Sequence, residues 1–242
     1  MTFPTKKAAD MSTAELAAYI DQSVLKPEFS QADIRRYIQE GIDFGCKTVC
    51  INPSSLPIAA ELTAGTPTGI CVVCDFPFGT STTNSKVAQA KEYCQNFKIQ
   101  DLDIVANYGW IRSGLWDSVT RDIAAVVDIC HNFGTLVKVI FETDALNHDQ
   151  IKKACLCAID AQADFVKTST GFLTGHNLRG AAPDIIQLML DTCQNKIKVK
   201  GSGCIRTRQH FFQLIDMGID RMGIGYRSTP IVLGKEEYYE SQ

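Results

Sequence analysis

Charged side chains occupy alternate positions in four consecutive segments that otherwise have the composition of buried β-strands. In chain order these are Asp103 in 101–107, Lys138 in 136–142, Lys167 in 165–170 and Lys200 in 196–202. Strands covered by helices on both faces are nearly continuous apolar runs, so a charge on such a strand must point at something other than a helix. The interior of a closed barrel is the natural destination for these side chains.

The segment 136–142 illustrates the pattern, because strand side chains alternate between two faces. Val137, Val139 and Phe141 share one face, which suits packing against helices, while Lys138 lies on the other face. The segment 101–107 repeats the alternation with acids. Burying an unpaired charge is costly, so neighbouring inward lysines tend to lose protons unless an acid such as Asp103 compensates. A neutral lysine amine is a nucleophile.

Segments typical of strands and of helices alternate eight times along the chain. The strand-like segments are 19–25, 48–52, 69–76, 101–107, 136–142, 165–170, 196–202 and 220–226. Capping-box spacing marks two helix starts, Ser12 with Glu15 and Ser30 with Asp33. Such a parallel α/β chain closes most simply as a single (β/α)8 TIM barrel with an N-terminal helix, although a doubly wound open sheet has the same periodicity. The inward charges favour the barrel.

Length and charge limit the other possibilities. The chain has 242 residues, 45% of them hydrophobic, which suits one barrel domain. We expect a flexible N-terminus at 1–10, the barrel at 11–234 and a polar tail at 235–242. The net charge of −3, with basic residues spread along the chain, gives no footprint for nucleic acid or an anionic membrane. Without a long apolar run or a signal-peptide core, the sequence predicts a cytoplasmic protein that acts on a small molecule.

Ten cysteines raise the question of a metal site or disulfides. Cys71 and Cys74 lie in one strand-like run, where alternation points their thiols to opposite faces, and no second pair with zinc-site spacing follows. Most of the others lie in helical patterns and have the character of small buried hydrophobes. Cys50, at the end of the second strand, is either a packing residue or an electrophile-sensitive residue of the site. No metal and no cofactor are predicted.

The lysines at 167 and 200 lie near the C-terminal ends of their strands, where barrel enzymes carry their chemistry. Each precedes a loop rich in glycine or hydroxyl groups, 168–171 and 201–203. Backbone N–H groups of such loops can approach an anion or a polarised oxygen closely. We therefore expect the loops after strands six to eight to bind substrate.

At seven ordered segments the sequence resembles the deoxyribose-phosphate aldolase family, and the resemblance covers nearly the whole chain. The segments are 20–27, 50–54, 75–83, 101–105, 137–143, 164–172 and 198–207. The resemblance implies a (β/α)8 barrel and a class I aldolase, which cleaves or joins acetaldehyde and glyceraldehyde 3-phosphate through a lysine Schiff base.

Carried over residue by residue, the resemblance implies three catalytic roles. Lys167 would form the Schiff base, Lys200 would be the neighbouring cation that favours the neutral form of that lysine, and Asp103 would be the carboxylate of the proton relay. Lys138 adds positive potential, and Thr170 is a supporting residue. A structural bridge between Asp103 and a lysine is the alternative for that carboxylate.

Substrate or phosphate binding is assigned to Gly171, Gly203, Cys204, Gly225 and Arg227. Several of these positions depart from the family. Cys204 stands where a second glycine is usual, and Tyr226 is expected to crowd the last turn. Arg227 would either supply a phosphate or carboxylate clamp there or face solvent. Asp75 also replaces a common glycine and is expected to disfavour an anionic substrate.

The resemblance thus predicts reversible cleavage of 2-deoxy-D-ribose 5-phosphate. The alternatives are a divergent aldolase for a non-phosphorylated or differently charged aldehyde, and a non-catalytic barrel that binds a sugar phosphate. Expected partners are a small-molecule aldehyde or sugar phosphate, with neither nucleic acid nor membrane, and a homodimer is implied by the family. Tyr238 and Tyr239 in the tail have no assigned role.

Overall fold

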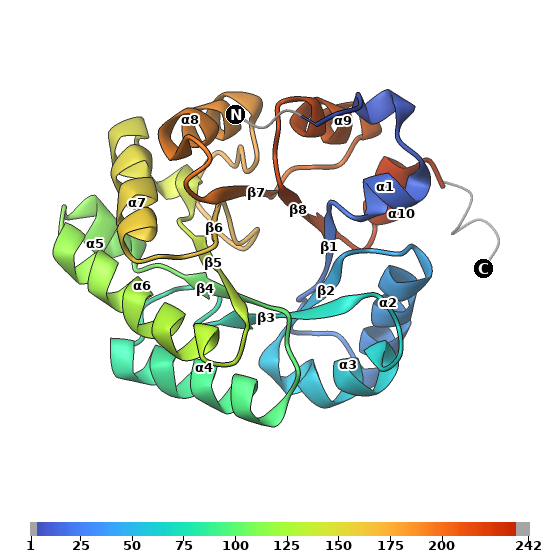
Figure 1. Ribbon diagram of the computed structural model, residues 1–242, viewed down its shortest axis with the longest axis horizontal. Helices are drawn as coiled ribbons and strands as arrows, with labels where there is room; N and C mark the ends of the chain where they lie inside the picture. The colour runs from blue at the N-terminus through green and yellow to red at the C-terminus, as the bar shows by residue number, and fades with distance from the viewer. Residues whose placement is uncertain (1–3, 236–242) are drawn as a thin grey trace.

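Eight parallel strands close into a barrel in the computed structural model, which describes residues 4–235. Each strand pairs with its neighbours in chain order, and β1 pairs with β8 to close the ring (Figure 1). The strands are β1 (Ile20–Val24), β2 (Thr48–Ile51), β3 (Gly69–Cys74), β4 (Asp101–Val105), β5 (Leu136–Ile140), β6 (Phe165–Lys167), β7 (Lys198–Ser202) and β8 (Arg221–Gly225). The predicted (β/α)8 barrel is confirmed, and the open sheet is not formed.

Helices surround the barrel and connect its strands (Figure 1). The α-helices are α1 (Thr13–Ala17), α2 (Gln31–Asp43), α3 (Leu56–Thr63), α4 (Thr83–Asn96), α5 (Tyr108–Arg112), α6 (Trp116–His131), α7 (His148–Asp160), α8 (Pro183–Cys193), α9 (Arg208–Asp216) and α10 (Thr229–Leu233). Short 3-10 helices are η1 (Ala8–Asp10), η2 (Pro53–Ser55) and η3 (Thr143–Ala145). The predicted capping boxes form at Ser12 with Glu15 and at Ser30 with Asp33.

Alternation along the strands separates an apolar outer face from a charged inner one. Val137 and Val139 of β5 are fully buried in the large core between strands and helices. Lys138, between them, is equally buried but contacts Asp103 on the neighbouring strand inside the barrel. The helices therefore cover the outer face of the sheet, while charged side chains lie on its inner face.

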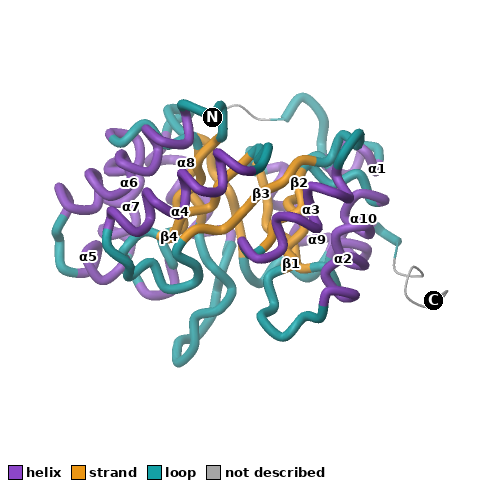
Figure 2. Tube along the Cα trace, turned by 90° about the horizontal axis from the view of Figure 1, so that it is seen from below, coloured by secondary structure: helices purple, strands orange, loops and turns teal. Residues whose placement is uncertain are grey.

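β6 is shorter than the 165–170 predicted from its sequence. After Lys167, the hydroxyl of Thr168 donates a hydrogen bond to the carbonyl oxygen of Ser202 at 2.8 Å and accepts one from the Ser202 amide at 2.9 Å. A side chain thus replaces the backbone ladder at this point. The chain then leaves the sheet in the long β6–α8 loop, and Figure 2 shows long loops projecting from one end of the barrel.

The segment before β1 is anchored to the barrel at residue 8. Ala8 is fully buried, and its amide donates a hydrogen bond to Asp216 at 2.8 Å. The flexibility expected for 1–10 and the domain limits at 11 and 234 stay predictions. Tyr238, Tyr239 and all of the tail beyond residue 235 lie outside the described residues. Over 4–235, no helix is long and apolar enough to cross a membrane.

Candidate active site

Asp103 lies at the centre of the three lysines that the sequence places on inward positions. Its Oδ2 atom lies 2.7 Å from Lys167 Nζ and 2.8 Å from Lys200 Nζ. Its Oδ1 atom lies 3.1 Å from Lys138 Nζ. Strand register produces this arrangement, because Asp103 is paired with Lys138 and Lys167 with Lys200. The structure therefore brings all four predicted groups together inside the barrel.

A deeper layer of charge lies beneath this cluster. Asp21 of β1 accepts hydrogen bonds from Lys200 at 2.5 Å and from Arg221 of β8 at 2.7 Å. Asp101 of β4 forms an ion pair with Lys138 at 2.6 Å. Sequence analysis gave these deeper residues no role. The signal was clearest for Arg221, which occupies an inward position of a strand that is otherwise apolar or small.

Counting these side chains leaves one positive charge in excess. Within residues 4–235, the interior cluster consists of three carboxylates, Asp21, Asp101 and Asp103, and four basic groups, Lys138, Lys167, Lys200 and Arg221. Lys138 contacts all three carboxylates, Lys200 contacts two, and Lys167 contacts Asp103 alone. Lys167 is thus the basic group with the least compensation.

The carboxylates determine the protonation of the deeper lysines. Burial lowers the pKa of Lys138 and Lys200, but Asp103 and Asp21 outweigh burial and raise both pKa values above the ordinary lysine value. Burial likewise raises the pKa of Asp103, but the three lysines outweigh it and hold that pKa well below its usual range. Acids compensate Lys138 and Lys200, Asp103 among them, so neither lysine tends to lose its proton, which is the exception that the sequence analysis allowed.

The loop after Lys167 is fixed by a buried acid. Glu142, which follows β5 with φ of 58°, accepts hydrogen bonds from the amide of Thr170 at 3.3 Å and from the Thr170 hydroxyl. Burial raises the pKa of Glu142, although the bonds from Thr170 oppose that rise. The Thr170 oxygen in turn accepts a hydrogen bond from the amide of Phe172 at 3.0 Å. These bonds hold the backbone that carries Lys167 into the loop.

A cavity of about 280 Å³ lies above the ends of β1, β6, β7 and β8. Its lining includes the predicted supporting or binding residues Thr170, Gly171, Gly203, Cys204 and Gly225. Lys167 itself is only 2% exposed and is not among the lining residues. Cys204 adopts φ of 60°, so the residue in the usual position of a glycine still takes the left-handed conformation.

Two basic residues that sequence analysis did not select line the cavity, Lys26 from the β1–α2 loop and Arg206 from the loop after β7. Arg227, which was selected, is exposed and is not among the lining residues; its guanidinium lies 5.4 Å from the centre of the Tyr226 ring. Arg206 lies in 198–207, one of the segments in which the sequence resembles the aldolase family. Nothing in that segment showed which of the loop side chains faces the cavity.

The other departures from the family have local explanations. Tyr226 lines the cavity but stacks with Tyr37, ring centres 3.9 Å apart. The carboxylate of Asp75 accepts hydrogen bonds from the amide and hydroxyl of Ser81 at 2.9 and 2.6 Å. Asp75 is not part of the cavity lining, so the expected repulsion of an anionic substrate has no short-range basis in this geometry.

Two cysteines lie next to the charged cluster. Cys50 and Cys71 are paired in register, both are fully buried, and Cys71 donates a hydrogen bond to Asp103 Oδ1 at 3.1 Å. The ligating atoms of Cys50, Cys71 and Asp103 lie within 4.8 Å of one another. The lysines bonded to Asp103 would repel a metal cation there, so we assign these residues no metal.

Comparison with known proteins places the chain among aldolases. The family model described as DeoC/LacD family aldolase matches residues 16–227. A deoxyribose-phosphate aldolase of Mannheimia succiniciproducens is 42% identical over 213 residues, which cover 88% of this chain and 92% of the relative. Deoxyribose-phosphate aldolase 1 of Staphylococcus aureus is 40% identical over 205 residues, 85% of this chain and 90% of that protein.

Solved structures agree with this similarity. The aldolase QR15 has a TM-score of 0.83 at 31% identity, covering 94% of this chain and 99% of its own. The tetrameric deoxyribose phosphate aldolase of Aeropyrum pernix has a TM-score of 0.82 at 25% identity, covering 94% and 93%.

Proposed function

The chain belongs to the DeoC/LacD family of aldolases, and from this premise we propose that it cleaves 2-deoxy-D-ribose 5-phosphate through a Schiff base on Lys167. The products are acetaldehyde and D-glyceraldehyde 3-phosphate. The observation that carries the assignment to Lys167 is the charge arrangement of the barrel interior. Of the four basic groups, Lys167 alone contacts a single carboxylate, and it is 2% exposed, whereas Lys138 and Lys200 are fully buried.

A neutral amine is required for attack on a carbonyl carbon. Arg221 cannot lose its proton at ordinary pH, and Lys138 and Lys200 are held protonated by two or three carboxylates each. Loss of one proton from the cluster balances three carboxylates with three cations. Lys167 is the group that can release this proton with the smallest loss of ion pairing.

The reaction then follows from imine chemistry. Neutral Lys167 attacks C1 of the open-chain sugar, and loss of water from the carbinolamine gives a protonated imine. This imine withdraws the electrons of the C2–C3 bond as the C3 hydroxyl loses its proton, which releases glyceraldehyde 3-phosphate and leaves an enamine. Protonation of the enamine at C2 and hydrolysis release acetaldehyde and restore the free amine.

Asp103 is suited to pass protons during these steps. Its Oδ2 atom lies 2.7 Å from Lys167 Nζ, within direct hydrogen-bond reach. Because the neighbouring lysines hold its pKa well below the usual range, the resting carboxylate is ionised and would hold a proton only transiently during these steps. Lys138 and Lys200 therefore have two proposed effects: they add positive charge near Lys167, and they keep Asp103 ionised.

The cavity beside this cluster is proposed to bind the phosphate end of the substrate. Gly171, Gly203 and Cys204 all have positive φ, a backbone form found where successive N–H groups face an anion. Gly225 completes this side of the lining, and Arg206 supplies the guanidinium. We propose Arg206 for this role in preference to Arg227, which does not line the cavity.

The test is borohydride trapping with acetaldehyde and, separately, with deoxyribose 5-phosphate, read by peptide mass spectrometry. Wild type is compared with Lys167→Ala and with Lys152→Ala, a half-exposed lysine on α7 that serves as a matched control. An adduct at Lys167 from both compounds is expected, in wild type and the control. An adduct from acetaldehyde alone would favour a different acceptor, and no adduct would favour the non-catalytic barrel.

Assembly and location remain proposals. The family resemblance implies a homodimer, while the relative from Aeropyrum pernix is described as tetrameric. A cytoplasmic location stays a prediction from the sequence. Light scattering of the purified protein measures the assembly directly.

A further inference from the structure

Asp103 accepts hydrogen bonds from four side chains within residues 4–235, and one of these donors is neutral. Lys167 and Lys200 donate to Oδ2, while Lys138 donates to Oδ1 at 3.1 Å. The fourth donor is the thiol of Cys71, which also lies 3.1 Å from Oδ1. The proposed reaction gives Cys71 no role, although its thiol is as close to the carboxylate as the Lys138 amine.

The other cysteine of β3 provides a contrast, because Cys71 and Cys74 lie on opposite faces of this strand. Cys74 belongs to the core between strands and helices, and its thiol donates a hydrogen bond to the carbonyl oxygen of Lys86 on α4 at 3.6 Å. Cys71 faces the interior of the barrel, where its sulfur accepts a hydrogen bond from Lys138 Nζ at 3.6 Å. The Cys71 thiol therefore joins Lys138 to Asp103.

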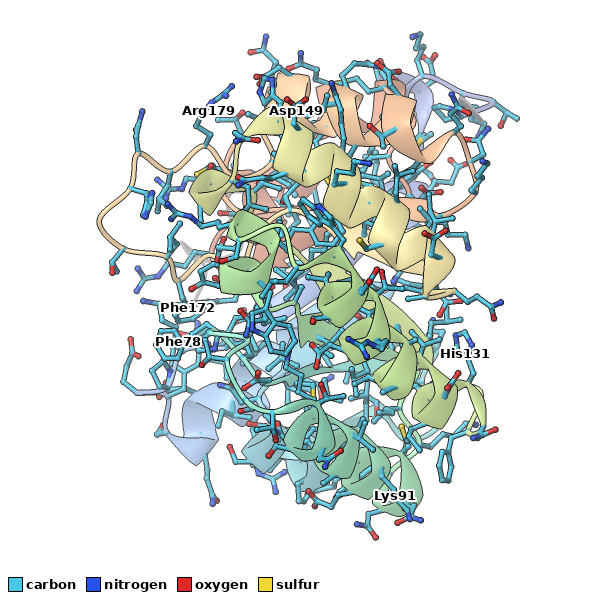
Figure 3. The ribbon with its side chains drawn as sticks, turned by 90° about the vertical axis from the view of Figure 1, so that its left-hand side faces the viewer. Phe78, Lys91, His131, Asp149, Phe172 and Arg179 are labelled. Carbon is cyan, nitrogen blue, oxygen red and sulfur yellow. The ribbon has the colours of Figure 1, made fainter. Side chains whose placement is uncertain are left out.

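Aromatic rings cover Cys71 on the side of the barrel mouth. Phe76 and Phe172, whose ring centres lie 5.3 Å apart, pack on an interior cluster of four side chains, Leu25, Cys50, Cys71 and Val73. Figure 3 shows Phe172 and Phe78 at one end of the molecule, away from His131 at the end of α6. Cys71 is fully buried beneath this cover. A hydrogen bond in such surroundings is electrostatically stronger than the same bond in water.

The Cys71 thiol keeps its proton in this environment. Burial raises the pKa of Cys71 well above the ordinary thiol value, and the neighbouring Cys50 and Asp103 act in the same direction. Cys71 is therefore a neutral donor. It directs the positive end of its S–H group at the carboxylate without adding a charge to the cluster.

From this geometry we propose that Cys71 is a positioning residue for the aldolase reaction, which acts through Asp103 on Lys167. By donating to Oδ1, the thiol holds the carboxylate with Oδ2 directed at Lys167, and it stabilises part of the negative charge. Oδ2 then holds the proton of Lys167 less tightly, which favours the neutral amine. The inference rests on the proposed function, because the group affected is the proposed nucleophile.

The charged groups around Asp103 limit the size of this effect. They come from every other strand that contributes to the cluster, namely Asp21 of β1, Asp101 of β4, Lys138 of β5, Lys167 of β6, Lys200 of β7 and Arg221 of β8. Removing the Cys71 thiol leaves the number of these charges unchanged. The effect on Lys167 should therefore be smaller than that of removing a lysine from the same cluster.

The test compares pH profiles of kcat/KM for deoxyribose 5-phosphate cleavage. Cys71→Ala removes the donor, so the acidic limb should move to higher pH by about half a unit. Activity below the limb should then fall about threefold, while the plateau above it changes little. Cys71→Ser retains a donor and should keep the limb near its wild-type position. Cys74→Ala is the matched control, because it removes a thiol from the outer face of the same strand and should leave the limb in place.

Cys71→Val, which has no donor but fills the space of the thiol, should shift the limb as Cys71→Ala does, and it serves if the alanine variant does not fold. Thermal unfolding and borohydride trapping at Lys167 are measured on the same proteins. An unshifted limb in the folded variants without a donor would overturn the inference and leave the proposed function intact. An equal shift in Cys71→Ser or in Cys74→Ala would assign Cys71 to packing alone. Absence of cleavage and of an adduct in wild type would remove the proposed function and the inference together.

Discussion

Lys167 Nζ and Asp103 Oδ2 lie 2.7 Å apart, and the same oxygen accepts a hydrogen bond from Lys200 at 2.8 Å. Among the described residues, Lys167 thus has one carboxylate and shares it, whereas Lys138 has three. The reactivity proposed for Lys167 is a property of how charge is distributed over six strands. This relationship leads to predictions that differ from those of an isolated ion pair.

Changing the number of deep charges should shift the pH dependence of the reaction. Lys138→Met removes a cation that does not contact Lys167, so Lys167 is then needed as the third cation and retains its proton. The acidic limb of the kcat/KM profile should move to higher pH by about one unit, and Asp101→Asn should move it to lower pH. Profiles of both variants, with thermal unfolding as a check of folding, measure this. If the acidic limb of the kcat/KM profile stays at the same pH in both folded variants, the charge balance of the cluster does not control the protonation of Lys167.

Arg206 should matter for the phosphate and Arg227 should not. Arg206→Gln removes a guanidinium from the cavity lining, and loss of a charge-assisted hydrogen bond of about 2 kcal/mol predicts a KM for deoxyribose 5-phosphate raised roughly 30-fold. Arg227→Gln is the matched control, because that side chain lies over the Tyr226 ring. The same assays with non-phosphorylated deoxyribose should show no difference between the variants. A larger effect at Arg227 would restore the original assignment.

A methyl group at Gly180 should disturb the turn at Gly203. Gly180 has φ of 54°, and an added Cβ would lie 2.5 Å from the carbonyl carbon and oxygen of Gly203. Gly180→Ala should cost about 3 kcal/mol, from strain and overpacking, and raise KM for the phosphorylated substrate. Gly175→Ala is the control, since Gly175 has φ of 76° in the same loop with nothing within 4 Å of an added Cβ. It should cost only about 1 kcal/mol and leave KM unchanged.

Glu142→Gln should alter how stability depends on pH. The folded protein raises the pKa of Glu142 above the ordinary 4.5, so it binds that proton more tightly than the unfolded chain. The contribution of Glu142 is therefore most favourable below the ordinary pKa and is lost as pH rises through the folded pKa. Glutamine keeps an oxygen to accept the Thr170 bonds and does not titrate. Urea unfolding at about pH 4 and at about pH 7 measures this. As the pH rises from the first value to the second, wild type should lose more free energy of unfolding than the variant does, and an equal change in both proteins would contradict the prediction.

The positions of the strands could be predicted because alternation is a local property. Three consecutive residues show this: Val137 and Val139 lie on one face of the sheet and Lys138 on the other, whatever the rest of the sequence is. The end of β6 could not be predicted, since it depends on bonds between Thr168 and Ser202 of the next strand. A strand can therefore be predicted from its own sequence, whereas the residue at which it ends depends on the strand beside it.

The site was predictable where charge sits on inward positions of recognisable motifs, as at Asp103 and Lys167. Arg221 was missed because its partner, Asp21, lies 200 residues earlier, so neither segment alone reveals the pair. The sequence could not show that Arg206 lines the cavity and Arg227 does not, because the direction of a loop side chain depends on packing. Compensation of the inward lysines by Asp103 was foreseen from the sequence, but the further acids Asp21 and Asp101, which also help Lys138 to keep its proton, were not.

The Asp21–Arg221 pair joins the first strand to the last, at the seam where β1 meets β8. During synthesis the ribosome delivers Asp21 long before Arg221 or Lys200 exists, so a nascent chain carries the acid of β1 without its partners. The protonation pattern proposed for Lys167 requires Lys200 and Arg221, so it can arise only once the final strand has emerged and docked. In the unfinished chain, the amine proposed as the nucleophile therefore lacks the charged surroundings on which its proposed reactivity depends.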